Sequence, residues 1–298
     1  MIDFSKIKTY PIKTRENKFK RTDFIDLNSS DKLLKHDGLE LLAKKMNAAK
    51  NEKKINMIMI GGHVIKVGCS RILIDLMKKG FINHVGANGS VAIHDFEIAL
   101  IGETSEDVAK TIEDGSFGMS EETGRMMNEA IIDGKNCQMG FGKSIGKMID
   151  EKDLPYKNDS VLYNAYKLNI PCSIHTAIGT EIIYQHPSCD GAAMGYTSYS
   201  DFKLITETIS KLEGGVVVNI GSAVIMPEVF LKAFTIARNL GYKIERFTAA
   251  NLDMIKHYRP TVNVVERPTS LGGEGIQVIE KHQLTLPTLY HLLVGSSK

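Results

Sequence analysis

The sequence has few cysteines, no paired cysteine motif and no long hydrophobic run. Its four cysteines, Cys69, Cys137, Cys172 and Cys189, show no CxxC spacing. They therefore predict neither a zinc framework nor a disulfide scaffold. Reduced cysteines are typical of the cytoplasm, where we expect this protein to reside.

The chain also lacks a clear excess of charge, because its formal net charge is only +2. Binding along nucleic-acid phosphates usually needs a basic surplus, so nucleic acid is not an expected partner. The apolar runs are short and end in glycine or polar residues, which argues against a membrane-spanning helix. The first residues, Met-Ile-Asp-Phe-Ser-Lys, hold no apolar stretch of the kind found in signal peptides.

What the chain does have is three apolar runs that each end in a glycine-containing turn: Ile58–His63, Val85–Ser90 and Val216–Ala223. A buried parallel strand reads as a continuous run of Val and Ile, and a following glycine lets the backbone approach a bound group. Helix-like sequence follows each turn, and a helix N-terminus offers N–H groups to an anion. Three such turns predict a nucleotide-type ligand in an open α/β sheet.

The pattern along the chain predicts a Rossmann-like, doubly wound α/β fold with a mostly parallel sheet. We expect residues 1–54 to form a basic arm and a helix, and residues 55–298 to form a single Rossmann-like catalytic domain. The first twenty-odd residues show little periodicity, so we expect a solvated arm, or one that packs on a neighbouring subunit.

The predicted elements alternate from residue 55 onward. Strands are predicted over Ile55–Ile60, His84–Ala87, Ile170–Ile174, Val216–Ile220, Lys243–Thr248 and Val262–Val265. Helices are predicted over Leu39–Ala49, Ser70–Lys79, Asp95–Leu100, Ser105–Ile112, Ser120–Gly134, Lys143–Leu154, Ser160–Leu168, Asp201–Leu212, Pro227–Gly241 and Leu289–Val294.

Two turns carry polar side chains close to the expected ligand. The stretch Gly61–Gly68 is not GxGxxG, and its Lys66 is either a phosphate contact or a surface lysine. In the next turn, His94 and Glu97 share a helix face. His94 beside carboxylates favours a general base, although acids in the first turn of any helix would give the same pattern. Too few ligands lie nearby to predict a metal site.

Two later segments add further candidates. His175, Glu181, His186 and Asp190 follow a predicted strand, whose carboxyl end is where open sheets bind ligands. The alternative is that His186-Pro187 braces a loop and Asp190-Gly191 forms a turn. The second segment holds Asp253, His257, Arg259 and Glu266, where an arginine either clamps an anion or pairs across a subunit interface. No nucleophile elbow, Walker motif, HExxH or EF-hand is present.

Taken in order, these segments resemble the deoxyhypusine synthase family, in particular its bacterial deoxyhypusine synthase-like branch. The resemblance covers residues 55–294. It is carried by Gly61–Gly68, Ala87–Val91, Tyr163–Pro171, Ile220–Met226 and Tyr258–Pro260, followed by a C-terminal P-x-L-L-like helix. It implies a Rossmann-type fold, a homotetramer, and NAD bound near subunit interfaces.

The resemblance also implies the residues that would contact NAD. They are Gly61, Gly62, His63, Lys66, Asn88, Gly89, Ser90, Gly221, Ser222, Ala223, Thr248 and Ala249. The founding activity removes the aminobutyl arm of spermidine and carries it as an imine on a lysine. That lysine is absent here, since the corresponding stretch is Val265-Glu266-Arg267-Pro268. A guanidinium stays protonated and cannot form the imine.

We therefore expect a deoxyhypusine synthase-like enzyme that performs NAD-dependent group transfer or elimination on a polyamine-like or other small polar substrate. Its catalytic candidates are His94, Asp95, His175, Glu181 and His186, and its substrate-binding candidates are Asp190, Asp253, His257, Arg259 and Glu266. Lys66 or Lys256 would be the substitutes for the missing lysine.

Two other functions fit the same sequence. A nucleosidase-type hydrolase or transferase would use the nucleotide pocket for its substrate, and release of free base from nucleosides would identify it. A regulatory homologue would have kept the fold and lost the chemistry. In that case, alanine at His175 and Glu181 would change stability but neither turnover nor binding.

Overall fold

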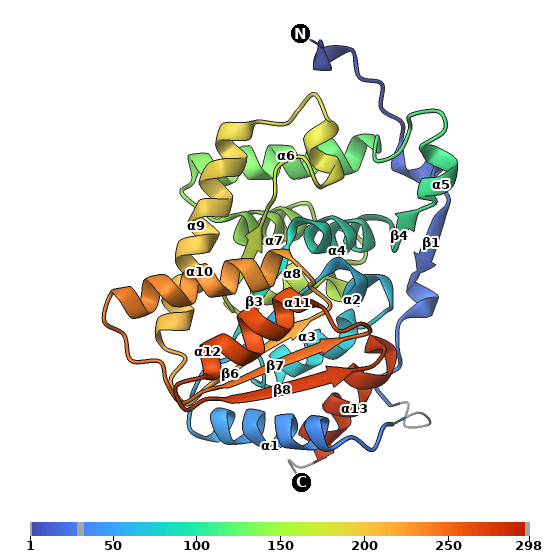
Figure 1. Cartoon of the computed structure of the whole chain (residues 1–298). Helices are drawn as coiled ribbons and strands as arrows, with labels where there is room; N and C mark the ends of the chain where they lie inside the picture. The colour runs from blue at the N-terminus through green and yellow to red at the C-terminus, as the bar shows by residue number, and fades with distance from the viewer. Residues whose placement is uncertain (1, 29–32, 296–298) are drawn as a thin grey trace.

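A six-stranded parallel sheet forms the centre of the computed structural model, which describes residues 2–28 and 33–295 (Figure 1). Its strands are β2 (Asn56–Ile60), β3 (His84–Asn88), β5 (Cys172–His175), β6 (Val216–Ile220), β7 (Thr248–Asp253) and β8 (Glu274–Ile279). Their spatial order is β5-β3-β2-β6-β7-β8, and every neighbouring pair is parallel. This is the doubly wound Rossmann order, so the predicted fold class is confirmed.

The order of strands reverses between β2 and β6. In open sheets of this kind, ligands bind outside the carboxyl ends of the strands at such a reversal. The turns that follow Ile60 and Ile220 therefore lie at the expected binding position.

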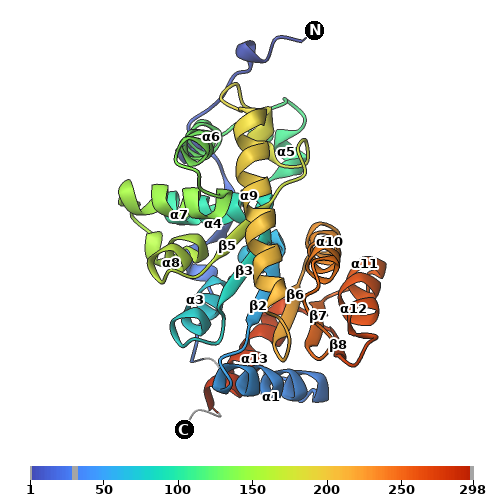
Figure 2. The ribbon, with the colours of Figure 1, turned by 90° about the vertical axis from the view of Figure 1, so that its left-hand side faces the viewer.

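Helices cover both faces of the sheet (Figure 2). The longer ones are α1 (Asp37–Asn51), α3 (Ser70–Lys78), α4 (Gly89–Ile101), α6 (Glu121–Asn136), α7 (Phe141–Glu151), α8 (Val161–Lys167), α9 (Gly191–Ser210), α10 (Ile225–Asn239) and α13 (His282–Gly295). Shorter ones are α2 (Gly62–Lys66), α5 (Val108–Thr111), α11 (Tyr258–Pro260), α12 (Arg267–Thr269), the 3-10 turns η1 (Phe4–Lys6), η2 (Ile12–Thr14), η3 (Arg21–Asp23), η4 (Lys157–Asp159) and η5 (Ile182–Gln185), and the π-helix η6 (Thr261–Glu266).

Alternate residues of β2, β6 and β7 face two separate cores, as the two-residue period of a strand requires. Ile58 and Ile60 pack in the larger core with α1, α3, α4 and α13. Met57 and Met59 pack in the smaller core with α9, α10 and η6. In the part of the chain that the structure describes, no helix has the length and apolarity to cross a bilayer.

The N-terminal arm is ordered on its own chain, whereas the sequence predicts a solvated arm or one packed on another subunit. Its strand β1 (Asn17–Lys20) pairs antiparallel with β4 (Glu103–Glu106). Phe19 and Phe24 are buried in the larger core and contact each other at 5.2 Å between ring centres. The sequence gives no sign of this strand, because Phe19 is its one apolar residue and lies between two lysines.

This pairing also corrects the helix predicted over Ser105–Ile112. Ser105 lies in β4 with a positive φ of 70°, and the helix begins only at Val108. Asp107 caps it, with its side chain accepting a hydrogen bond from Ala109 N–H. Pairing with β1 of the arm thus holds Ser105 and Glu106 in a strand, although their local sequence favours the start of a helix.

Two predicted strands are also wrong. The strand predicted over Lys243–Thr248 begins only at its last residue, as β7, and β8 was not predicted. Val262–Val265 lies in the π-helix η6, where Val264 and Val265 are buried in the smaller core. A short apolar run has no periodicity that separates a strand from a buried helical turn.

Candidate functional site

The three glycine turns meet at the carboxyl end of the sheet. Gly61 N–H donates to the Ile220 carbonyl at 3.0 Å, and a Cβ on Gly61 would lie 2.1 Å from the Gly221 carbonyl oxygen. A Cβ on Gly62 would lie 2.5 Å from Ser90 Oγ. The backbone contact at Gly61 allows only glycine, since a side chain would push the turns apart, whereas a side chain on Gly62 would displace the Ser90 hydroxyl.

Asn88 organises the second turn, Val85–Ser90, as the N-cap of α4. Its Oδ1 accepts hydrogen bonds from Val91 N–H at 3.3 Å and from Ser90 Oγ at 2.9 Å. Such a cap satisfies a free N–H of the first helical turn. The structure thus brings together the predicted cofactor residues Gly61, Gly62, Asn88, Gly89, Ser90, Gly221 and Ser222, with Ala223 next in the chain.

Other predicted cofactor residues lie elsewhere. Thr248 and Ala249 pair with Val216 and Val217 at the amino end of the sheet, away from the turns. His63 lies in α2, close to the turns, and its ring centre is 5.7 Å from that of His282.

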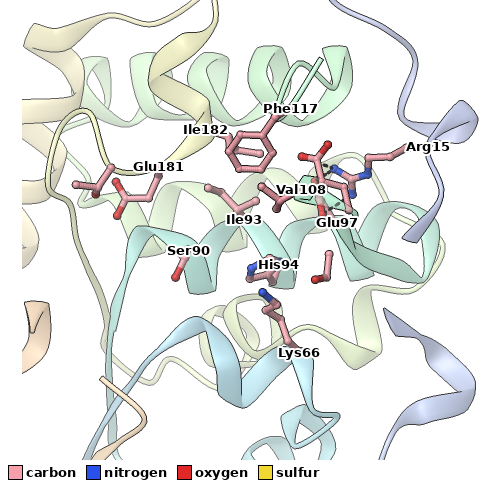
Figure 3. Close-up of a pocket in the computed structure, with 13 residues that line it drawn as sticks. Arg15, Lys66, Ser90, Ile93, His94, Glu97, Val108, Phe117, Glu181 and Ile182 are labelled. Atoms are coloured by element: carbon pink, nitrogen blue, oxygen red, sulfur yellow. Dashed lines mark hydrogen bonds and ion pairs between the residues drawn. The ribbon is translucent and has the colours of Figure 1, made fainter. Parts of the chain in front are cut away.

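A pocket of about 190 Å³ adjoins the turns on the side of α4 (Figure 3). It unites Ser90, Lys66, His94 and Glu181 from the predicted set. The remaining lining residues are Arg15, Ile93, Glu97, Ser105, Glu106, Val108, Phe117, Thr180 and Ile182. Several separate segments therefore line the pocket, among them the N-terminal arm, helix α4, strand β4 and the loop before η5.

His94 has a fixed tautomer in this pocket. Thr104 Oγ1 donates its proton to Glu97 Oε2 at 2.6 Å, so it accepts one from His94 Nδ1 at 2.8 Å. Nε2 of His94 is then unprotonated and able to accept a proton. Burial lowers the pKa of His94 to about 4, which keeps the ring neutral at pH 7.

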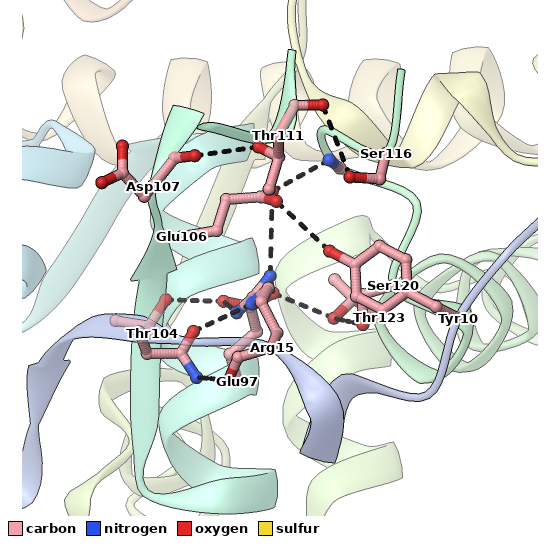
Figure 4. Close-up of polar contacts among 12 residues, drawn as sticks. Tyr10, Arg15, Glu97, Thr104, Glu106, Asp107, Thr111, Ser116, Ser120 and Thr123 are labelled. Atoms are coloured by element: carbon pink, nitrogen blue, oxygen red, sulfur yellow. Dashed lines mark hydrogen bonds and ion pairs between the residues drawn. The ribbon is translucent and has the colours of Figure 1, made fainter. Parts of the chain in front are cut away.

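Glu97 is held by the arm through a buried ion pair (Figure 4). Arg15 donates to its two oxygens at 2.9 and 2.7 Å, and Thr123 donates at 2.9 Å. Burial alone would raise the pKa of Glu97, but the charge and hydrogen bonds of Arg15 hold it below its ordinary value. Sequence analysis missed Arg15, because only the three-dimensional pairing of the arm brings it to α4.

Glu181 is the third acid of the pocket, beside Glu97 and Glu106, and has no cationic partner in the described chain. It is 9% exposed and lies against Gly89, where a Cβ would come within 2.8 Å of its carboxyl group. Burial raises the pKa of this carboxyl above its ordinary value. A bound cation would therefore stabilise its ionised form.

Two catalytic candidates have structural contacts away from the pocket. Asp95 caps α8, accepting hydrogen bonds from Val161 N–H at 2.7 Å and Leu162 N–H at 3.0 Å. His186 donates from Nε2 to the Gly118 carbonyl at 2.8 Å, which braces a loop. Neither side chain lines the pocket.

His175 ends β5 and belongs to a buried polar chain. Its Nε2 and Nε2 of His84 each lie 3.0 Å from Ser173 Oγ, and His84 Nδ1 lies 2.7 Å from Thr208 Oγ1. Burial lowers the pKa of both histidines to about 3. His175 thus lies at the correct edge of the sheet but is not part of the pocket wall.

The predicted substrate residues do not gather in one place. Asp190 is the N-cap of α9, Arg259 pairs with Glu228 at 3.2 Å, and Glu266 is exposed at the end of η6. His257 precedes α11. Asp253 alone is buried at the carboxyl end of its strand, β7.

His282 is a candidate that sequence analysis missed. It is fully buried at the start of α13, and neither ring nitrogen has a hydrogen-bond partner among the described residues. Its Nε2 would lie 2.5 Å from a Cβ on Gly221, whose φ is +65°. No sequence pattern connects His282 with the turns, because it lies far from them along the chain. Across residues 2–28 and 33–295, no cluster of three His, Cys, Asp or Glu is suited to a metal ion.

Comparisons with known proteins show the fold of this chain. No family model and no curated protein matches its sequence. A conserved putative LOR/SDH protein from Methanococcus maripaludis S2 superposes with a TM-score of 0.57 and 18% identity, covering 92% of this chain and 71% of that one. A putative deoxyhypusine synthase from Entamoeba histolytica gives 0.53 and 13%, covering 88% of each chain.

AgrE, in a ternary complex with ornithine and NAD+, superposes with a TM-score of 0.57 and 15% identity over 89% of this chain. This chain spans only 34% of the length of AgrE. At these identities the likeness extends to the fold alone. The fold is thus similar to that of deoxyhypusine synthase-like and LOR/SDH proteins, in agreement with the resemblance found in the sequence.

Proposed function

We propose that this protein is an NAD-dependent enzyme that oxidises a small polar substrate at a C–N or C–O centre before group transfer or elimination. The observation that carries the proposal is His94, a neutral imidazole with an accepting Nε2 in a pocket next to the glycine turns. A general base needs both the accepting atom and a route to substrate.

The residues at the turns fit a dinucleotide. The contact of Gly61 with Gly221 leaves backbone groups at the strand reversal, where dinucleotides bind in this topology. The unpartnered ring nitrogens of His282 add polar groups beside Gly221. NAD, when bound, would supply a hydride acceptor. AgrE, which shares the fold, has been crystallised with NAD+.

The chain's own residues would handle the proton. Nε2 of His94 takes a proton from the substrate, and Thr104 and Glu97 keep its ring oriented. The proposal excludes a lysine imine at the family's position, since Arg267 lies there and donates to Asn263 Oδ1 at 2.9 Å.

The first test is calorimetric titration of the purified protein with NAD+. We expect saturable binding with a stoichiometry of one per chain. Binding of a nucleoside without any binding of NAD+ would favour a hydrolase or transferase and contradict the proposal. If neither binds, the protein is not the proposed enzyme.

The second test concerns His94. Formation of reduced nicotinamide is followed by absorbance with a panel of small amines, amino acids and alcohols. His94→Asn should lower kcat by about 10²–10⁴-fold while leaving NAD+ affinity unchanged, because a general base acts on the chemical step. Thr104→Val should lower kcat less, and the matched control Thr104→Ser, which keeps the hydroxyl, should remain active. Full activity of His94→Asn would show that another group is the base.

A further inference from the structure

An imidazole without any hydrogen bond lies beside the glycine turns. His282 is fully buried, and both of its ring nitrogens lack a hydrogen-bond partner among residues 2–28 and 33–295. Its Nε2 faces Gly221, since a Cβ on that glycine would lie 2.5 Å away. A buried polar group without a partner is costly, so this imidazole indicates a ligand that completes its hydrogen bonds.

His282 is also the first residue of a long helix. Helix α13 begins at His282 and continues to Gly295. The first N–H groups of a helix have no acceptor within the helix, and the helix dipole favours negative charge at that end. The helix end and the unpartnered imidazole therefore favour the same class of ligand, an anion.

A second imidazole lies next to the first. The ring centre of His63 is 5.7 Å from that of His282, and His63 is only partly buried. His63 belongs to α2, which starts directly after Gly61. Two histidines from distant parts of the chain therefore meet beside the glycine turns.

Both histidines are neutral at pH 7 in the free protein. Burial lowers the pKa of each ring, that of His282 to about 4, and the nearby charge of Asp253 opposes this effect. Among the described residues, the charged or titratable groups that face or adjoin the two histidines are Lys66, Cys69, Asp253 and Lys281. Burial raises the pKa of the Cys69 thiol to about 12, so it carries no charge.

The glycine turns connect this pair of histidines with the pocket. A Cβ on Gly62 would lie 3.3 Å from Cδ2 of His94, and Gly61 contacts Gly221. The glycines thus form a continuous path of backbone from His94 to His282. One extended ligand, such as a dinucleotide, could therefore reach both the base and the histidine pair.

We propose that His63 and His282 form a phosphate-binding site, which takes up a proton from solvent when a phosphate of the ligand binds beside Gly221. This inference rests on the proposed function, since the phosphates are the two diesters of a dinucleotide. A negative charge favours the protonated imidazole, so one ring becomes a cation and donates to the phosphate. The charge of Asp253 acts in the same direction.

Binding should become tighter as the pH falls. In the free protein both rings are neutral, whereas in the complex one ring is protonated. The affinity for the phosphate ligand therefore rises as the pH falls through the pKa of that ring in the complex. For one proton, the rise is at most about tenfold per pH unit, and the affinity is level at higher pH.

Calorimetric titration of the whole protein measures the proton directly. NAD+ is titrated at about pH 6 and about pH 8, each time in two buffers of different ionisation enthalpy, whose heats differ in proportion to the protons taken up. ADP-ribose keeps both phosphate diesters and lacks nicotinamide, and adenosine has no phosphate. The diesters do not themselves titrate near neutral pH, since they lack the second ionisation of a phosphate monoester.

We expect NAD+ and ADP-ribose to take up close to one proton per chain at about pH 6 and almost none at about pH 8. Their affinity should be on the order of tenfold higher at the lower pH, as one linked proton requires. Adenosine should bind without proton uptake. Equal affinity and no proton uptake for NAD+ at both pH values would overturn the assignment.

Variants identify the histidine that takes the proton. His282→Gln and His63→Gln each keep a hydrogen-bonding side chain that carries no charge, and at least one of them should abolish the uptake and the pH dependence. The matched control is His291→Gln, further along the same helix, which should behave as the wild type does. Wild-type proton uptake in both glutamine variants would show that another group binds the proton and would contradict the proposal.

The outcome is distinguishable from failure of the proposed function. Binding of NAD+ without proton uptake would overturn only the histidine site. Proton-linked binding of ADP-ribose without any binding of NAD+ would support the histidine site and overturn the redox role. If neither ligand binds, both proposals fail.

Discussion

The folded protein should lose stability steeply as the pH falls from about 6 to about 4.5. The cause is a set of buried histidines whose pKa burial lowers: His84 and His175 to about 3, and His94 and His282 to about 4. Once unfolded, each imidazole regains its ordinary pKa near 6.5 and takes up a proton. Their stabilisation is complete above that pKa and is lost as the pH falls.

Two buried aspartates act in the opposite direction. Burial raises the pKa of Asp95 to about 6 and that of Asp201 to about 7, so near pH 5 both are protonated when folded and ionised when unfolded. Their stabilisation is complete below the ordinary pKa of aspartate and is lost as the pH rises through the raised values. Near pH 5, unfolding thus takes up four protons and releases two. The net two give a slope of about 2.7 kcal/mol per pH unit.

Urea unfolding at a series of pH values measures this slope directly. His282→Leu removes one titrating group that has no hydrogen-bond partner among the described residues, and should reduce the slope to about half. The contribution of the aspartates can be separated with Asp201→Asn, which should steepen the slope. Stability that stays constant or increases on acidification would contradict the burial of these histidines.

Loss of Arg15 should have the largest effect of any single substitution in the arm. Arg15→Met leaves Glu97 buried without its cation, and removal of one partner of a buried pair costs about 3–5 kcal/mol. The double variant Arg15→Met, Glu97→Leu should recover part of that loss, since Glu97 no longer leaves a buried charge, while Glu106 keeps only its hydrogen bonds from Gly118 N–H and the Tyr10 hydroxyl. The free energy of unfolding in urea, measured for both variants, checks the expectation.

A control variant in the arm shows whether the loss of stability comes from the buried ion pair of Arg15. Lys18→Met, in the same arm but exposed and paired with Asp107, is the matched control and should change stability by less than about 1 kcal/mol. A similarly small loss in Arg15→Met would mean that water reaches Glu97 and that the arm does not close the pocket.

The sequence predicted the central sheet because buried parallel strands and glycine turns are local signals. Ile55–Ile60 and Val216–Ile220 were recognised as strands, and the turns after them meet as expected. β8 was missed because Glu274, Gly275 and Gln277 interrupt the continuous apolar run by which the other strands are recognised. The strand predicted at Val262–Val265 was wrong because these valines are apolar in order to pack in the core. A run this short is apolar in a buried helical turn as well as in a buried strand.

The candidate site was predictable only in part. His94, Glu181, Lys66 and Ser90 were all among the predicted residues, and the structure places them in one pocket. Arg15 and His282 were not, because each reaches the site from a distant part of the sequence. Helical spacing places Asp95 off the face that His94 and Glu97 share, and the Asp95 side chain indeed turns toward α8.

The pairing of β1 with β4 affects how the pocket is assembled during folding. Asn17 pairs with Glu106, and Arg15 reaches Glu97, so these contacts join residues far apart in the chain. Contacts of large sequence separation form slowly because closing the intervening loop costs entropy. The arm is synthesised before α4 and β4, yet it cannot dock until those elements have been made. The pocket should therefore be among the last parts of the molecule to become complete.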